Sequence, residues 1–286
     1  MSEKKRLLAV FAHPDDETFA TGGTLALYAQ RGVDVYLLCA TRGEAGEVEQ
    51  KYLKGFASIA ELRQAELACA AKKLGLRGVF FLDYRDSGMT GSPHHTHPAA
   101  LINAPLQKLA KEIAVWIRRL RPQVVITSDP IGGYHHPDHI HLQRAVQQAF
   151  FIAGDANAYT DSPPAYTPQK LYFNTIPRTL LRWVVRLMPL FGKDPRRFGQ
   201  NGDIDILAIT AVDFPVHARI DFSPVARLRK EASNCYTSQG GQHLHQGIAA
   251  LLRGWTLSGE IFMRAYPPPR PGYVEKDLFE GISLED

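Results

Sequence analysis

Cysteine is scarce in this chain, and its spacing is not that of a metal-binding or redox motif. The 286 residues hold three cysteines, Cys39, Cys69 and Cys235, and no two of them form a C-x-x-C pair. Cys39 and Cys69 lie in apolar runs, where we expect small core residues. An odd number of cysteines, behind an N-terminus without the pattern of a signal peptide, predicts reduced thiols and a cytoplasmic protein.

Long apolar runs and dense basic runs are also absent from the sequence. No stretch approaches the ~20 apolar residues needed to span a bilayer. The net charge of +4 is mild and no cluster of Lys and Arg accompanies it, so nucleic acid is not an expected partner. No glycine-rich nucleotide-binding pattern and no G-x-S-x-G motif occur, which disfavours phosphate-loop and serine-hydrolase chemistry. The pair Gly22-Gly23 is expected instead to let a helix pack closely on the sheet.

The first half of the sequence alternates strand-like and helix-like segments. The expected strands cover 7–12, 33–40, 78–82 and 124–127, and the expected helices cover 18–31, 62–74, 106–120 and 138–150. Gly32 and Gly75 stand where helix C-caps are needed. This β-α-β-α order implies a mostly parallel sheet with right-handed crossovers, so we predict an α/β, Rossmann-like three-layer fold.

The second half is less regular, and its elements are harder to assign. We expect a loop over 155–168, strands over 170–176 and 204–212, a helix over 226–236 and an irregular tail from 267. The length suits one large α/β domain. We therefore predict a single domain over 1–286, with a Rossmann-like core (1–155) followed by a less regular C-terminal part (156–286).

The most informative segment is A-H-P-D-D-E at 12–17, directly after the first expected strand. An imidazole and adjacent carboxylates thus emerge at the carboxyl edge of the sheet, where ligands bind in open α/β folds. Burying His13, Asp15 and Asp16 together is costly unless they are paired or bind a metal ion. The segment therefore indicates a metal site.

A second polar segment follows the fourth expected strand and ends in H-P-D-H at 136–139. In a parallel sheet its loop opens at the same edge as 12–17, and two histidines with one carboxylate and an open position form a recurring catalytic zinc site. We expect Asp138 to be a helix N-cap, with His139 in the first turn. Each segment alone is also what a helix cap and buried hydrogen bonds produce, but two at one edge favour a metal. His135 and His141 are the competing ligands.

These segments resemble the LmbE-like, or PIG-L, family of zinc-dependent N-deacetylases. The resemblance is carried by A-H-P-D-D-E and H-P-D-H, and by T-R-G-E-A-G at 41–46 and R-D-S-G-M at 85–89. It runs from about residue 6 to 150 and returns near Ser238-Gln239. A departure is Tyr236, which stands where the family often has histidine, and 177–203 is similar to an insertion.

The resemblance implies a role for each matching residue. The implied zinc ligands are His13, Asp16 and His139, for one zinc ion per chain, with iron or another divalent ion as the alternative. The implied catalytic residues are Asp15 as general acid and base, His136, protonated, beside the charged intermediate, and Tyr134 as oxyanion donor. Asp138 beside His136 is expected to hold that imidazole or favour its charge. Arg63 and Asp86 are implied to bind sugar hydroxyls or a phosphate of the substrate.

The expected reaction is removal of an N-acetyl group from an amino-sugar conjugate of the N-acetylglucosamine type. The core 1–155 then holds the metal, and 156–286 completes the substrate cleft. One alternative is an amidase acting on a larger thiol- or sugar-conjugate amide, and another is a non-catalytic sugar-binding or metal-binding member of the fold. An intact Asp15 disfavours the last, because binding alone needs no base.

Residues 178–191 form an unusual segment, with Arg178, Arg182 and Arg186 at helical spacing among apolar side chains. The pattern predicts a basic amphipathic helix that docks onto the domain or forms a subunit contact in a homo-oligomer. Attachment to a membrane surface through this helix, or a lid over an apolar substrate group, are the alternatives.

Overall fold

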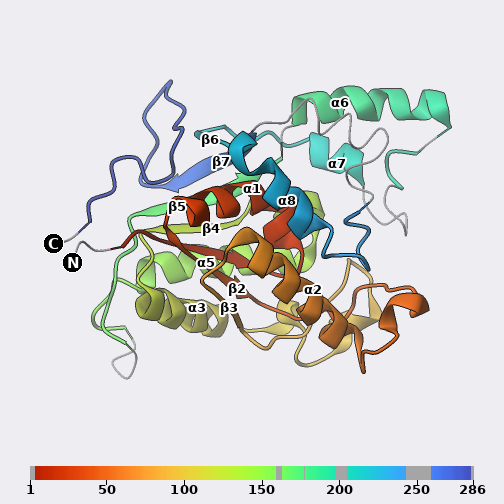
Figure 1. Ribbon diagram of the computed structural model, residues 1–286, viewed down its shortest axis with the longest axis horizontal. Coiled ribbons are helices and arrows are strands. Elements are labelled where there is room, and N and C mark those ends of the chain that lie inside the picture. Colours follow the sequence, from red (N-terminus) through yellow and green to blue (C-terminus); the bar gives the residue numbers. More distant parts are fainter. Residues whose placement is uncertain are drawn as a thin grey trace.

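The computed structural model describes residues 4–158, 163–176, 178–192, 194–197, 205–242 and 259–284. Within them lies a seven-stranded sheet in the order β3-β2-β1-β4-β5-β7-β6 (Figure 1). The strands are β1 (Arg6–Phe11), β2 (Asp34–Cys39), β3 (Gly78–Phe81), β4 (Val124–Ser128), β5 (Lys170–Thr175), β6 (Ala218–Asp221) and β7 (Gly259–Tyr266). The strands β1 to β5 pair in parallel, whereas β7 pairs antiparallel with β5 and β6.

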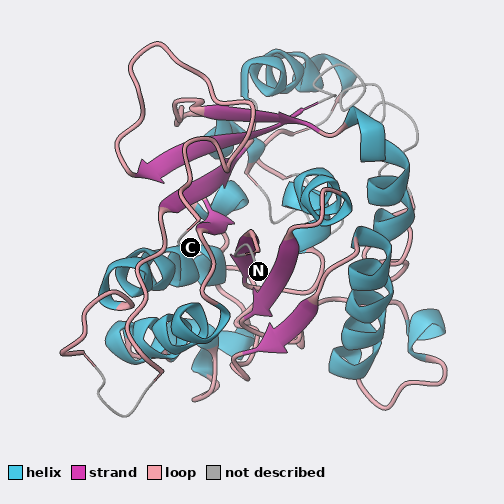
Figure 2. Ribbon diagram, turned by 60° about the vertical axis from the view of Figure 1, so that its left-hand side comes forward, coloured by secondary structure: helices cyan, strands magenta, loops and turns pink. Residues whose placement is uncertain are grey.

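Helices cover both faces of this sheet, as Figure 2 shows. The α-helices are α1 (Asp16–Gln30), α2 (Ile59–Leu74), α3 (Leu106–Leu120), α4 (Gly132–His135), α5 (Pro137–Ile152), α6 (Arg178–Leu187), α7 (Ile206–Thr210) and α8 (Ala226–Ser233). Short 3-10 helices are η1 (Gln50–Leu53), η2 (Pro93–Thr96), η3 (Leu101–Asn103), η4 (Met188–Phe191) and η5 (Ser223–Val225). The predicted α/β three-layer fold is confirmed.

Strand β1 explains the three layers, because its alternate side chains enter two separate cores. Leu7 and Phe11 pack in a core with side chains of α1, α2 and α8. Leu8 and Val10 pack in the other core, with side chains of α3 and α5. Successive side chains of a strand point to opposite faces, so a run of apolar residues that is buried throughout requires cover on both sides.

Strands β1 and β4 are neighbours, with Leu7 paired to Val124 and Ala9 to Ile126. β1 connects onward to β2 on one side of this pair, and β4 connects onward to β5 on the other. The pair is thus the topological switch point of the parallel part, where a crevice opens beyond the carboxyl ends of the strands. The loops that carry 12–15 and 129–136 begin at this point.

Local sequence accounts for the start of α2. The Ser58 side chain accepts from the backbone N–H of Glu61 at 3.1 Å, and the Glu61 carboxylate accepts from the N–H of Ala57 at 2.6 Å. This reciprocal pattern resembles a capping box and satisfies backbone donors that the first turn leaves free. The helix ends at Gly75, which has φ of 75°.

The C-terminal part contains corrections to the predicted elements. The strand predicted over 204–212 is wrong for its described residues: Ile206–Thr210 form α7, with Asp205 accepting from the N–H of Ala208 as the N-cap. A short apolar run has no period that separates helix from strand, and the cap decides it here. The antiparallel strands β6 and β7 were not predicted. The helix expected over 178–191 is present as α6 followed by η4.

Helix α6 lies with α7 at one end of the molecule (Figure 1). It leaves Trp183 and Leu187 exposed, together with Leu190 in η4. Subunit contact and membrane attachment through this segment stay predictions. Among the helices that the structure describes, none has both the length and the apolar character needed to cross a bilayer.

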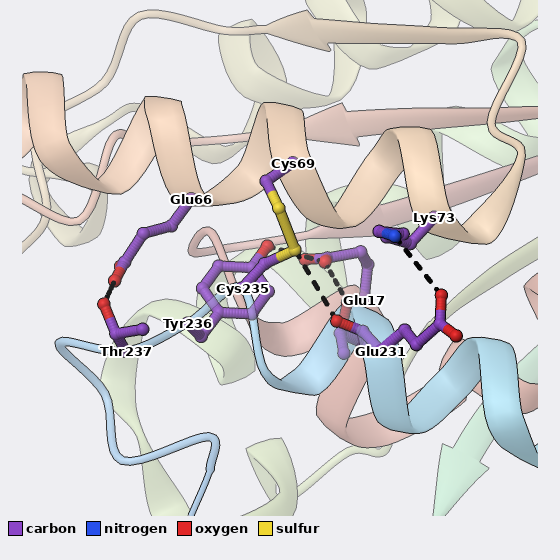
Figure 3. The surroundings of a disulfide bond; sticks show 9 residues. Glu17, Glu66, Cys69, Lys73, Glu231, Cys235, Tyr236 and Thr237 are labelled. Carbon is purple, nitrogen blue, oxygen red and sulfur yellow. Dashed lines mark hydrogen bonds and ion pairs between the residues drawn. A yellow bond between two sulfur atoms is a disulfide. The ribbon is translucent and has the colours of Figure 1, made fainter.

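The prediction of reduced thiols is wrong for two of the three cysteines. Cys69 of α2 and Cys235, just after α8, form a disulfide across 166 residues of sequence (Figure 3). α2 and α8 pack side by side and bring the two Cα atoms to 5.8 Å, a separation typical of disulfides. Cys69 is also exposed rather than a core residue. Cys39 is buried and carries a free thiol.

Candidate metal and catalytic site

Three donor atoms converge at the switch point of the sheet. His13 Nδ1 lies 3.1 Å from His139 Nε2, and Asp16 Oδ2 lies 3.1 Å from His139 Nε2 and 3.5 Å from His13 Nδ1. His13 follows β1, Asp16 begins α1, and His139 stands in the first turn of α5. The structure thus brings together the three residues for which the resemblance implies a metal-ligand role.

This triangle has the dimensions of a metal site. A tetrahedral zinc ion lies about 2.0–2.2 Å from nitrogen and oxygen ligands, so its ligand atoms stand about 3.4 Å apart. The observed separations of 3.1 to 3.5 Å match that spacing. Two overlapping groups of side chains also have ligand atoms close enough to share an ion: His13 with His136 and His139, and His13 with Asp86 and Asp138.

The far side of the His13 ring faces carboxylates. Its Nε2 lies 3.2 Å from Asp138 Oδ2 and 3.3 Å from Asp86 Oδ1. Burial opposes a charge on this ring, but Asp86, Asp138 and Asp16 together raise the pKa of His13 well above its usual value. Carboxylates that accept the Nε2 proton fix the tautomer in which Nδ1 presents a lone pair to a metal.

The position of Asp138 corrects its expected role as a helix N-cap. α5 begins at Pro137, and His136 is the N-cap: its Nδ1 accepts from the N–H of Asp138 at 3.2 Å. Proline suits the first helical position, because its missing N–H would have no partner there. Asp138 therefore falls inside the first turn, and its carboxylate accepts from Ser87 N–H at 2.9 Å as well as contacting His13.

Asp86, for which the resemblance implies substrate binding, is buried against the same ring. Besides its contact with His13, it accepts from the N–H of Gly88 at 2.8 Å and of Ala45 at 3.3 Å. Burial opposes its charge, yet the contact with His13 and the hydrogen bond from Gly88 lower the pKa of Asp86. The observed contacts of this carboxylate are with the metal-site histidine and with two site loops.

Asp15 lies beside the triangle. Its backbone has a φ of 117°, which is rare for residues other than glycine. Burial raises its pKa to about 7; Asp16 and Glu17 act in the same direction, while Arg63 and His13 oppose them. A carboxyl group that titrates near neutrality can both accept and return a proton at physiological pH. Arg63 donates to Asp15 Oδ2 at 3.0 Å.

Glycines of the T-R-G-E-A-G segment make room for Arg63. A Cβ on Gly46 would stand 2.7 Å from Arg63 Nη1, and one on Gly43 would stand 3.2 Å from the guanidinium carbon. The same guanidinium donates to the carbonyl of Pro14. The buried Arg63 side chain thus extends from α2, past these two glycines, to the loop that carries Asp15.

Tyr134 and His136 complete the group around the metal ligands. The Tyr134 ring packs edge-on against His139 and His136, with centroids 5.3 and 5.8 Å apart. Burial, together with the neighbouring His13 and His139, lowers the pKa of His136 to about 2. This direction opposes the expected charge on His136. Because Nδ1 accepts the N–H of Asp138, the neutral ring carries its proton on Nε2 and is a donor there.

The loop that carries Tyr134 depends on a residue that the sequence did not single out. The buried Asp129 carboxylate accepts from the N–H of Gly133 at 2.9 Å and of Ile131 at 3.1 Å, and it pairs with Arg178 of α6 at 3.3 Å. Glu17, the last residue of the A-H-P-D-D-E segment, is likewise a residue to which the sequence assigned no role. His141, a predicted competing ligand, instead places Nε2 2.9 Å from the carbonyl oxygen of Ala104.

Fold and site together define an α/β enzyme built around a His–Asp–His cluster at the carboxyl edge of a parallel sheet. The chain belongs to the PIG-L family, described as GlcNAc-PI de-N-acetylase, whose model matches residues 8–150. It is 39% identical over 292 residues to a 1D-myo-inositol 2-acetamido-2-deoxy-alpha-D-glucopyranoside deacetylase of Thermobifida fusca, covering 96% of this chain and 99% of that relative. The predicted family and the prediction of a deacetylase are confirmed.

Solved structures share the fold at lower identity. N,N'-diacetylchitobiose deacetylase from Pyrococcus horikoshii superimposes with a TM-score of 0.62 at 18% identity, covering 92% of this chain and 84% of that one. GalB, the 4-carboxy-2-hydroxymuconate hydratase from Pseudomonas putida KT2440, gives 0.60 at 18% identity, covering 94% and 99%. A hydratase among these neighbours indicates that the architecture alone does not determine the reaction.

Proposed function

We propose that this protein removes the acetyl group from the nitrogen of an N-acetylglucosaminyl conjugate, with a glucosaminyl-inositol as the favoured substrate and zinc as the metal. The observation that carries the proposal is the triangle of His13, Asp16 and His139 donor atoms beside Asp15. The inositol glycoside comes from the Thermobifida fusca relative, whose similarity extends over nearly the whole chain.

The donor set suits the chemistry of amide hydrolysis. Two neutral imidazoles and one carboxylate leave a divalent zinc ion with net positive charge. When bound there, zinc supplies Lewis-acid chemistry, because it lowers the pKa of water and polarises a carbonyl group. The same donor set also accommodates ferrous iron.

Asp15 is the proton carrier in this proposal. With a pKa of about 7, its carboxylate takes the proton of the attacking water and returns it to the departing amine nitrogen. Acid–base catalysis of this kind is worth about 10²–10⁴-fold in rate. Arg63 increases the ionised fraction of Asp15, because its guanidinium opposes the effect of burial on the pKa.

Tyr134 and His136 are the donors for the oxyanion. Burial and the negative field of Asp16 and Asp15 raise the pKa of the Tyr134 hydroxyl, so it stays protonated and can donate. His136 donates from Nε2 as a neutral imidazole. Losing one such donor typically costs about 10²–10³-fold in turnover.

Asp86 and Asp138 act through His13, whose ring they orient from the side away from the metal. Direct contact of Arg63 or Asp86 with substrate hydroxyls, as the resemblance implies, belongs to the proposal as well. We further propose that the chain works as one catalytic unit, since residues after 156 supply part of the sheet and of the site surroundings.

An acetate-release assay tests this function. The protein is stripped with a chelator and reloaded with Zn²⁺ or Fe²⁺. It is then offered N-acetylglucosaminyl-inositol, N-acetylglucosamine and N,N'-diacetylchitobiose, and free amine and acetate are both measured. We expect both products in equal amounts only with a metal, and most rapidly from the inositol glycoside. A folded, metal-loaded protein that releases neither product from any of the three contradicts the proposal.

A further inference from the structure

A chain of buried hydrogen bonds connects the end of α8 to the backbone of Asp15. The Tyr236 hydroxyl donates to Glu17 Oε1 at 2.6 Å, and Glu17 Oε2 accepts from the N–H of Asp15 at 3.0 Å. Tyr236 and Glu17 are both fully buried, and Thr18 Oγ1 donates to the same Glu17 oxygen as Tyr236. No step of the proposed reaction uses Tyr236 or Glu17.

The Asp15 backbone needs such support. Its φ of 117° lies in the region that side-chain-bearing residues rarely adopt, and a conformation of this kind persists only where the surrounding structure compensates its strain. A carboxylate that accepts the N–H of Asp15 compensates part of that strain. It also fixes the direction in which the Asp15 side chain leaves the backbone.

Tyr236 is in turn held against α2 from both sides (Figure 3). On one side Cys235 is bonded to Cys69. On the other, Glu66 accepts from Thr237 Oγ1 at 3.1 Å and from the backbone N–H of Ser238 at 2.8 Å. Glu66 and Cys69 are three residues apart and lie on the same face of α2. Together they hold the segment 235–238, which contains Tyr236, against this helix.

We propose that Tyr236 is a positioning residue for the deacetylation: through Glu17 it holds the Asp15 backbone, and the Cys69–Cys235 disulfide holds Tyr236 in place. The inference rests on the proposed function. According to this inference, the disulfide affects the turnover rate although its cysteines are far from the metal ligands in the sequence. Cys69 lies exposed on α2, so a reductant can reach the bond.

Kinetics of Tyr236→Phe test the first part. The substitution removes one hydroxyl and keeps the ring that packs edge-on against Phe19, so the fold is retained. We expect kcat to fall by about 10- to 100-fold, since small misplacements of a catalytic group have effects of that size. KM and bound metal should stay unchanged. A residue that only packs would lower Tm and leave kcat alone at temperatures well below Tm.

Glu17→Gln is the conservative companion. Its amide oxygen can still accept from Asp15, and the hydroxyls of Thr18 and Tyr236 can rotate to accept from its NH2 group. It should therefore keep more activity than Glu17→Ala, which has no acceptor for the Asp15 N–H. An equal loss in both, with metal content intact, contradicts the positioning role of Glu17.

Reduction tests the second part. A tertiary phosphine converts the disulfide to two thiols and is itself oxidised to the phosphine oxide, with water supplying the oxygen and the protons. We expect reduction to lower kcat without changing KM, and by less than Tyr236→Phe, because Glu66 still holds Thr237 and Ser238. The double variant Cys69→Ser/Cys235→Ser should show the same lowered kcat and no further response to the phosphine.

Two outcomes overturn the inference while leaving the proposed function standing. The first is an active wild-type protein whose kcat is equalled by that of the Tyr236→Phe variant. The other is a double serine variant with wild-type kcat, or one that loses activity to the phosphine as the wild type does. An inactive wild type instead contradicts the proposed function itself.

Discussion

Arg63 Nη2 donates to Asp15 Oδ2 at 3.0 Å, and this contact joins a helix on one face of the sheet to the loop that follows β1. Burial raises the pKa of the Asp15 carboxyl group, and the guanidinium opposes that effect. The contact therefore sets how much of the carboxylate is available as a base.

Replacing Asp15 with Asn should separate catalysis from metal binding. Asparagine is nearly isosteric and is among the residues that tolerate positive φ, so the loop should keep its conformation. We expect kcat to fall by about 10²–10⁴-fold, because the amide cannot carry the proton. Metal content, measured by plasma mass spectrometry, should equal that of the wild type. Full turnover by this variant would remove Asp15 as the base.

The pH profile should respond to the charge at position 63. Asp15 acts as a base when ionised, so kcat/KM should rise with pH through an apparent pKa of about 7. Arg63 lowers that pKa, so Arg63→Gln should shift the rising limb to higher pH and lower the rate at pH 7. Arg63→Lys keeps the charge and serves as the control. A limb that stays in place or moves to lower pH in the glutamine variant would contradict the assignment.

Much of the parallel core could be predicted from the sequence, because its elements are marked locally. Buried strands such as Val124–Ser128 begin with continuous apolar runs, and Gly75 ends α2 where its left-handed conformation is needed. The C-terminal strands have no such marks. Strand β6 has four residues, and its partner β7 begins well downstream, so their pairing depends on contacts that the sequence does not reveal.

In the candidate site, too, some features could be predicted from the sequence and others could not. The meeting of His13 and His139 followed from strand order, since loops after neighbouring parallel strands open at one edge. The direction of the Asp138 carboxylate did not follow, because it depends on Pro137 taking the first helical position. The Cys69–Cys235 bond was missed because three cysteines at wide spacing favour no pairing, and only the packing of α2 on α8 selects one.

Two histidines of α5 offer a matched test of the metal ligands. His139→Ala removes one corner of the donor triangle and should lose the metal and the activity. His141→Ala removes a ring that faces the Ala104 carbonyl, so it should keep both. Both variants are purified and reloaded with Zn²⁺ identically, and bound metal per chain is then measured. Unchanged zinc in His139→Ala would move the ligand assignment elsewhere.

Neighbouring glycines in α1 should respond in opposite ways to the same substitution. A Cβ on Gly23 would stand 2.2 to 2.7 Å from atoms of the buried Phe222 ring, whereas one on Gly22 would have ordinary contacts of 3.6 Å or more. Gly23→Ala should therefore lower the free energy of unfolding by about 1–3 kcal/mol through overpacking. Gly22→Ala should raise it by about 0.5–1 kcal/mol, because alanine favours the helix. Urea unfolding followed by circular dichroism measures both, and equal effects in the two variants would mean that α1 does not pack on Phe222 as described.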